Sequence, residues 1–199
     1  FHNLYLNGEL VTDLVIPDDI TTIPYQAFIY VTCLESITIP DTVTSVETGA
    51  FCGCSNLKEV RLSNSITALN SYTFVGCESL TSLVIPANVM VINSNVFGDY
   101  YDRSALKEIT FLGNPPLIAD DGFSKVTATA YYSANNASWT EDYLQNYGGN
   151  ITWLSSQELP DTENTSKVYI IASGICGTDI HFHNGKLSHR VRRCRSPLR

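Results

Sequence analysis

The segment LESITIPDTVTSVETGAFCGCSNL, residues 34–57, contains one complete unit of a pattern that recurs along the chain every 23 residues. The same apolar side chains return at each step, above all one phenylalanine and the residue that begins each apolar stretch. These residues are Phe28, Phe51, Phe74 and Phe97, and Val11, Leu34, Leu57 and Leu80. A period in the twenties is typical of a unit that cannot bury its apolar face alone and stacks on copies of itself. The sequence therefore predicts a solenoid.

Each unit begins with a pattern that favours one short β-strand. Ile37 and Ile39 alternate with Ser36 and Thr38, as in a strand with one buried face, and Pro40 ends the strand because it cannot donate to a ladder. The apolar residues that follow are spaced for short turns around the same core. We therefore expect coils of about 23 residues that are mostly β, with irregular and 3-10 segments. Ser63 replaces the strand-ending proline in one unit, a change that we expect to have little effect.

This pattern resembles the BspA-type, or Treponema-type, leucine-rich repeat of bacterial surface proteins. The resemblance covers residues 11–123, about five coils, and includes the opening segment Leu4 to Pro17. It implies a leucine-rich repeat solenoid with right-handed coils. It also implies an extracellular location on a bacterial surface, and partners among extracellular or host surface proteins.

The two ends of the array are expected to be caps. Residues 1–17 contain Asn7-Gly8 between apolar runs, the strongest short signal for a β-hairpin, which would shield the open end of the core. Residues 124–154 read as a small α/β cap. There Ser138 and Glu141 are spaced as a capping box, Trp139 to Tyr147 reads as a short helix, and residues 150–154 read as a final strand. Residues 155–199 are expected to be a linker and tail, either a truncated further module or disordered.

The outward positions of the expected strands are the candidate binding site, because stacked coils hold such side chains at fixed spacing. Solvated sheet residues without a ligand would give the same pattern. The candidates are Asp13, Ser36, Thr38, Glu59, Arg61, Ser82, Glu108 and Thr110. A three-residue insertion at 98–105 adds Tyr100 and Tyr101, either as a partner contact or as a neutral length variant.

The six cysteines are not expected to form the disulfide framework of a small secreted domain, because the core is large enough without such bonds. Cys54 and Cys77 occupy one repeat position, where the preceding unit has Val31. Because valine serves there too, we expect a ladder of buried thiols, although the spacing of adjacent strands would also permit a disulfide.

Signals for chemistry are sparse. No nucleophile elbow, zinc-protease motif or phosphate loop occurs, and residues 3–180 contain no histidine, the usual general base. Glu59 and Glu108 would lie on an open face about 10 Å apart, from strand spacing. The histidines and cysteines of the tail (Cys176, His181, His183, His189, Cys194) do not have the spacing of a standard finger. We therefore expect no enzyme, no cofactor and no metal.

Charge and hydropathy exclude two classes of partner. The net charge is −8, which divides into −14 for residues 1–182 (six basic and 20 acidic side chains) and +6 for residues 183–199. The acidic body would repel nucleic acid. The most apolar run, Val168 to Cys176, is far shorter than the roughly 20 residues of a membrane span. Leu159 to Glu163 resembles a sortase signal but has Glu163 where that signal has glycine.

These observations predict a non-enzymatic recognition or adhesion module that binds protein ligands through the sheet of the repeat. Two alternatives remain. A structural spacer of a surface protein would need no binding face, and a carbohydrate-binding module would need aromatic side chains in line on the sheet.

Overall fold

The computed structural model describes residues 3–98, 104–157, 181–183 and 186–188. The chain divides into two compact units, Phe1–Thr165 and Ser166–Arg199. In the second unit, β15 (His181–His183) pairs antiparallel with β16 (Lys186–Ser188). The first unit contains the whole repeat pattern.

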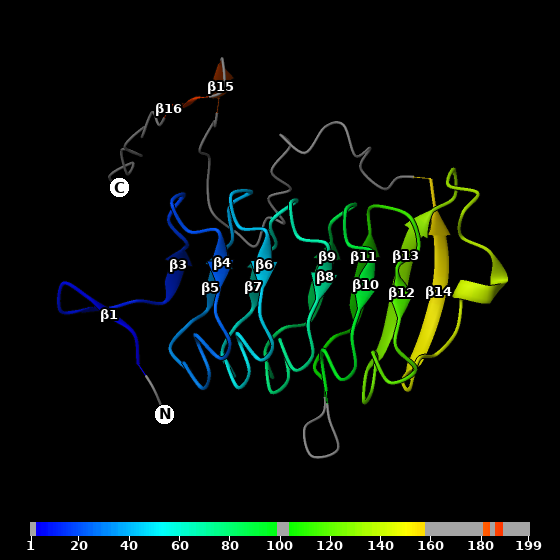
Figure 1. Cartoon of the computed structure of the whole chain (residues 1–199), viewed down its shortest axis with the longest axis horizontal. Helices are drawn as coiled ribbons and strands as arrows, with labels where there is room; N and C mark the ends of the chain where they lie inside the picture. The colour runs from blue at the N-terminus through cyan, green and yellow to red at the C-terminus, as the bar shows by residue number, and fades with distance from the viewer. Residues whose placement is uncertain (1–2, 99–103, 158–180, 184–185, 189–199) are drawn as a thin grey trace, which may run out of the picture. The chain divides into compact units, whose positions relative to one another are not determined.

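The first unit is a β-solenoid of about six turns, with coils stacked in chain order (Figure 1). Each coil contributes a strand to one side, which we call the front, and most coils contribute a two-residue strand to the other side, the back. The front strands are β3 (Asp13–Val15), β5 (Ser36–Thr38), β7 (Glu59–Arg61), β9 (Ser82–Ile85), β11 (Glu108–Phe111), β13 (Thr127–Ser133) and β14 (Asn150–Ser156). The back strands are β4 (Thr22–Ile23), β6 (Ser45–Val46), β8 (Ala68–Leu69), β10 (Val91–Ile92) and β12 (Leu117–Ile118).

Front strands pair in parallel with neighbouring front strands, and back strands with neighbouring back strands. Asp13 lies opposite Ser36, which lies opposite Glu59, so each step from β3 to β7 is one 23-residue period of the sequence. The front ladder is hydrogen-bonded in two parts, β3-β5-β7 and β9-β11-β13-β14. The back ladder likewise divides into β4-β6 and β8-β10-β12. Both interruptions adjoin the coil that contains β7 and β8.

Side-chain hydrogen bonds help to hold this coil to the one before it. Asn70 Nδ2 donates to Val46 O over 2.8 Å, and Ser63 Oγ donates to Val43 O over 2.6 Å. Ser63 is fully buried, and its Oγ also accepts the N–H of Ser65. The serine that replaces the repeat's proline is therefore a bonded element of the structure.

A spine of stacked phenylalanines runs through the core, as the period predicts. Ring centroids are 5.4 Å apart for Phe28 and Phe51, 5.8 Å for Phe51 and Phe74, and 6.1 Å for Phe74 and Phe97. Phe123 extends the stack beyond Phe97 at 5.8 Å. Burial of each ring contributes roughly 1.5–3 kcal/mol, so the spine is a principal source of stability.

The N-terminal hairpin forms as predicted. β1 (Tyr5–Leu6) pairs antiparallel with β2 (Glu9–Leu10). Asn7 and Gly8 between them have φ angles of 51° and 86°, as the favoured two-residue hairpin turn requires. The hairpin extends past the first coil (Figure 1), and Leu6 is 67% exposed. It therefore shields the end of the core less than expected.

The C-terminal cap is closed by aromatic side chains. The Trp139 ring meets Phe111 edge-on at 5.2 Å, and its Nε1 donates to Gly113 O over 3.1 Å. Trp153 packs against Phe111 at 5.6 Å. The predicted final strand is confirmed by β14, which buries Ile151.

The helix predicted for residues 139–147 is wrong, so the α component of the cap is absent. The described cap contains only the 3-10 helix η1 (Glu141–Tyr143), and Thr140 at its N-cap makes no side-chain capping bond. The backbone turns earlier, because the main-chain and side-chain oxygens of Asn136 accept the N–H groups of Trp139 and Ser138. Burial of the Trp139 ring in the core outweighs the local helix signal.

Candidate functional site

The outward side chains of the front strands form two columns along the solenoid. They face outward because alternate residues, such as Ile37, Leu83 and Ile109, point into the core and are at most 3% exposed. The first column is Asp13, Ser36, Glu59, Ser82, Glu108, Thr129 and Thr152. The second is Val15, Thr38, Arg61, Val84, Thr110, Tyr131 and Leu154. We call the two columns together the front face.

All eight sheet residues proposed from the sequence lie on the front face. Five of them are exposed: Asp13, Glu59, Arg61, Ser82 and Glu108. Three are half-buried: Ser36, Thr38 and Thr110. The interruption between β7 and β9 divides them into a group on the first three coils and a group on the next two. Sequence reasoning did not include the columns' continuation into the cap, although Thr129 and Tyr131 already alternate with small buried residues.

Hydrogen bonds fix the carboxylate at the N-terminal end of the first column. Asp13 accepts from Ser36 Oγ at 2.6 Å and from Thr12 Oγ1 at 2.9 Å. These bonds, the one from Ser36 above all, lower the pKa of Asp13 below its ordinary value. Asp13 is therefore a fixed negative charge at neutral pH.

A further charged pair, not predicted from the sequence, lies one residue before the first column. Lys58 Nζ contacts Glu35 Oε2 at 2.8 Å between neighbouring coils, with both side chains at least half exposed. An exposed pair of this kind contributes little stability. The 23-residue spacing of the two residues is the signal that could have identified it. The pair adds both signs of charge next to the first column, where Lys58 also contributes to the lowered pKa of Asp13.

The second column also exposes aliphatic side chains. Val15 is 67% exposed, Val84 49% and Leu154 47%. They alternate along the column with hydroxyl side chains and with the guanidinium of Arg61. The front face therefore presents apolar side chains and charged side chains in the same column.

Cys54 and Cys77 are free, buried thiols, as predicted for a ladder. Cys54 Sγ donates to Phe28 O over 3.1 Å, and Cys77 Sγ donates to Phe51 O over 3.3 Å. Burial raises the pKa of Cys54 to about 12 and that of Cys77 well above its ordinary value. Both thiols therefore stay protonated and act as core side chains.

Several other candidates lie outside the described residues. These are Tyr100 and Tyr101, Cys176, His189 and Cys194, and the sortase-like segment at 159–163. In the described ranges, no group of three or more His, Cys, Asp or Glu side chains is placed to hold a metal ion. Among these same residues, no helix has the length and hydropathy needed to cross a membrane.

Comparison with known proteins places this geometry in a family. The family described as "BspA type Leucine rich repeat region" matches residues 2–130 in six copies. No significant match was obtained among curated proteins.

Two solved structures share the fold. A leucine-rich cell surface protein from Faecalibacterium prausnitzii matches 65% of this chain and 34% of its own length, with 29% identity and a TM-score of 0.55. The pneumococcal vaccine antigen PcpA matches 73% of this chain and 42% of its own length, with 18% identity and a TM-score of 0.53. The chain thus spans less than half of either protein. With the repeat register and the phenylalanine spine, the family match shows that this chain belongs to the BspA-type leucine-rich repeat family.

Proposed function

We propose that the chain is a non-enzymatic recognition module of a bacterial cell-surface protein, and that it binds extracellular or host protein ligands through the front face. The observation that carries this proposal is the composition of that face. Exposed Val15, Val84 and Leu154 share a column with Arg61, beside Asp13, Glu59 and the Glu35–Lys58 pair. Protein interfaces combine apolar contacts with charges that steer and select the partner.

The family and its structural relatives support the location. The relative from Faecalibacterium prausnitzii is described as a cell surface protein. A parallel ladder with one face open to solvent also suits recognition, because neighbouring coils hold the outward side chains at one strand spacing. A protein ligand can then meet several coils at once.

A carbohydrate-binding role has less support. Exposed tyrosines occur at Tyr25, Tyr30 and Tyr72, but these residues lie in the turns and not on the front strands. On the front face itself, the aromatic side chain among the described residues is the half-buried Tyr131. Flat stacking on a sugar chain would need such rings in line.

The test is an array of extracellular proteins and glycans probed with the full chain. We expect saturable binding to at least one protein, which Arg61→Glu weakens roughly tenfold by reversing a charge on the front face. Lys125→Glu makes the same change in a turn outside the front strands and should leave binding unchanged. Binding that is insensitive to Arg61→Glu would exclude the front face. The absence of any ligand would favour the spacer, and binding to glycans alone would favour the carbohydrate module.

A further inference from the structure

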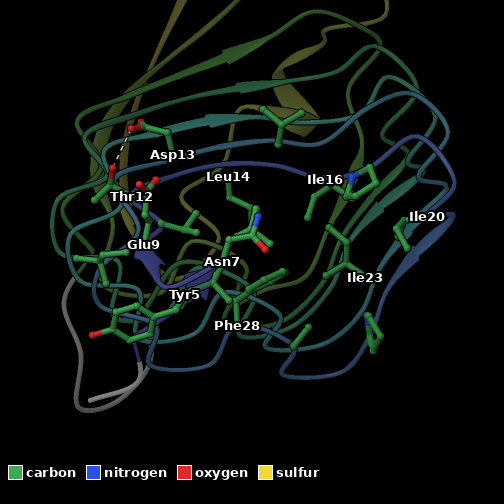
Figure 2. Close-up of a pocket in the computed structure, with 18 of the residues that line it drawn as sticks. Tyr5, Asn7, Glu9, Thr12, Asp13, Leu14, Ile16, Ile20, Ile23 and Phe28 are labelled. Atoms are coloured by element: carbon green, nitrogen blue, oxygen red, sulfur yellow. Dashed lines mark hydrogen bonds between the residues drawn. The ribbon is translucent and has the colours of Figure 1, made fainter.

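The N-terminal end of the solenoid contains a pocket of about 890 Å³ between the hairpin and the first coil. Figure 2 shows Leu14, Ile16, Ile23 and Phe28 of the first coil around it, with Tyr5 and Asn7 from the hairpin. Every later coil has this side covered by the coil before it. Phe51, for example, is fully buried under Phe28, whereas Phe28 itself is only half-buried. The pocket is thus a stacking position that the hairpin leaves open.

The strand beside this pocket has one free edge. β3 pairs with β5 alone among the strands of the described chain. The bonds to β5 use the even-numbered residues, because Ile16 N donates to Thr38 O, and Thr12 O accepts from Ser36 N. Since successive residues of a strand bond to opposite sides, the peptide groups of Asp13 and Val15 point away from β5. Such an edge can accept a further strand.

The surroundings of the pocket are acidic. Residues 1–57 include seven carboxylates (Glu9, Asp13, Asp18, Asp19, Glu35, Asp41 and Glu47) and no lysine or arginine. Glu9 and Asp13 line the pocket, and Asp18 and Asp19 are exposed in the turn that follows β3. The first cation along the chain, Lys58, is already paired with Glu35. The electrostatic potential at the N-terminal end of the solenoid therefore favours a positively charged partner.

We propose that this end of the solenoid binds an extended, cationic segment of a partner protein, which adds as a strand to the free edge of β3. Alternate aliphatic side chains of that segment fill the pocket against Leu14 and Phe28. Its lysine or arginine side chains lie on the other face, beside Asp13. Main-chain hydrogen bonds supply affinity in this mode, and the pocket and the carboxylates select the sequence. This site shares Asp13 and Val15 with the front face, and it differs from the front-face ligand site in using the pocket and the free edge of β3.

The probe is a fluorescein-labelled peptide with the pattern Lys-Ile-Arg-Ile-Lys-Ile-Arg, titrated with the full chain and followed by fluorescence anisotropy. We expect saturable binding that weakens with added salt. A peptide of the same composition with its isoleucines grouped together cannot place them on one face of a strand, and should bind roughly tenfold more weakly. A peptide with glutamate in place of lysine and arginine should bind at least as poorly. Equal binding of the grouped and alternating peptides would overturn the proposal.

Two pairs of variants locate the site. Asp13→Asn should weaken the peptide several-fold and reduce its salt dependence, whereas Glu108→Gln, in the same column two strands beyond the ladder break, should not. Val15→Pro removes a peptide N–H that points away from β5, and should abolish binding without breaking the β3–β5 ladder. Val15→Thr keeps that N–H and should bind normally. If Val15→Pro binds as tightly as Val15→Thr, no strand is added at this edge.

Hydrogen exchange keeps the proposal testable should Val15→Pro fail to fold. Bound peptide should slow exchange of the amides of Asp13 and Val15 in the unmodified chain, and unchanged exchange there at saturation would refute strand addition. Sedimentation of the chain alone tests whether a second copy of the chain occupies this end instead. Self-association that competes with the peptide, and that Asp13→Asn alters, would mean that a second copy occupies this end and that the proposal is wrong.

Discussion

The ring of Tyr30 lies over Gly53 of the next coil, in the space that a side chain at position 53 would need. A Cβ atom built on Gly53 would lie 2.2 Å from Tyr30 Cδ1. Gly53 also has a φ of +75°, in the left-handed region that side chains disfavour. The contact therefore links a requirement for glycine in one coil to an aromatic residue 23 positions earlier.

Replacement of Gly53 by alanine should lower the free energy of unfolding by more than its backbone conformation alone explains. The left-handed φ costs about 1–2 kcal/mol for a residue with a Cβ, and displacement of the Tyr30 ring adds to this cost. Gly8→Ala is the matched control, because Gly8 has a φ of +86° and no atom within 4 Å of its added Cβ. Urea unfolding followed by circular dichroism measures both. Equal losses for the two variants would show that the Tyr30 contact does not constrain position 53.

Truncation of the phenylalanine spine should cost less at its N-terminal end than in its middle. Phe74→Ala removes a ring that is 2% exposed and stacked on both sides, and should cost about 3–5 kcal/mol. Phe28→Ala removes a half-buried ring stacked on one side, and should cost markedly less. The two losses are compared by the denaturant concentration at the midpoint of unfolding, provided that the m-value is the same for both variants. A loss at Phe28 as large as that at Phe74 would mean that the end of the core is closed in solution.

The two tryptophans of the chain should differ in their effect on stability. Trp139→Phe loses the bond from Nε1 to Gly113 O in the buried cap, and should cost about 1 kcal/mol or more. Trp153→Phe loses a bond to Gln145 O at an exposed position, where water can replace the donor. Thermal unfolding of both variants tests this order. A larger loss of stability for Trp153→Phe would show that the hydrogen bond of Trp139 contributes less to the closed cap than that of Trp153.

Stability should fall at alkaline pH because of the buried thiols. The pKa of Cys54 rises from 9.0 to about 12 on folding, so the unfolded thiol ionises first as the pH rises. The buried, protonated thiol contributes its full stabilisation below pH 9.0. This contribution to the free energy of unfolding falls by about 1.4 kcal/mol per pH unit between pH 9.0 and about 12. Cys54→Val places there the residue type that the preceding coil uses, Val31. The variant should lose less stability between these pH values in urea titrations, and an identical pH dependence would show that this thiol does not titrate as described.

The repeat positions were predictable because one steric requirement recurs in every coil. Over the first four coils, the spine, the parallel register and the two columns of the front face follow from residues 23 apart, such as Ile37 and Val60. The hairpin at Asn7-Gly8 was predictable for a local reason, since its turn requires two positive φ angles. The candidate site was predictable only as a set of outward positions, because strand alternation shows which side chains face solvent and not which ligand they contact.

The predictions that failed depend on contacts between residues distant in sequence. The spacing of Ser138 and Glu141 favoured a helix, but burial of Trp139 against Phe111 and its bond to Gly113 produced turns instead. The hydrogen bond that Ser63 donates could not be predicted from the local sequence either, because its acceptor, the carbonyl of Val43, lies 20 residues away. Local propensities are small beside the burial of a large ring.

From its sequence alone, this chain is a stacked array with a set of outward-facing side chains, because a period of 23 residues leaves each coil no other way to bury its phenylalanine. Tertiary packing decided the state of the two ends. Both ends carry apolar residues that read as caps, yet Trp139 and Trp153 close one end, while the hairpin leaves Phe28 half-buried at the other. Whether a terminal segment covers the core depends on how close its side chains lie to the terminal coil in space. A local sequence pattern does not specify that distance.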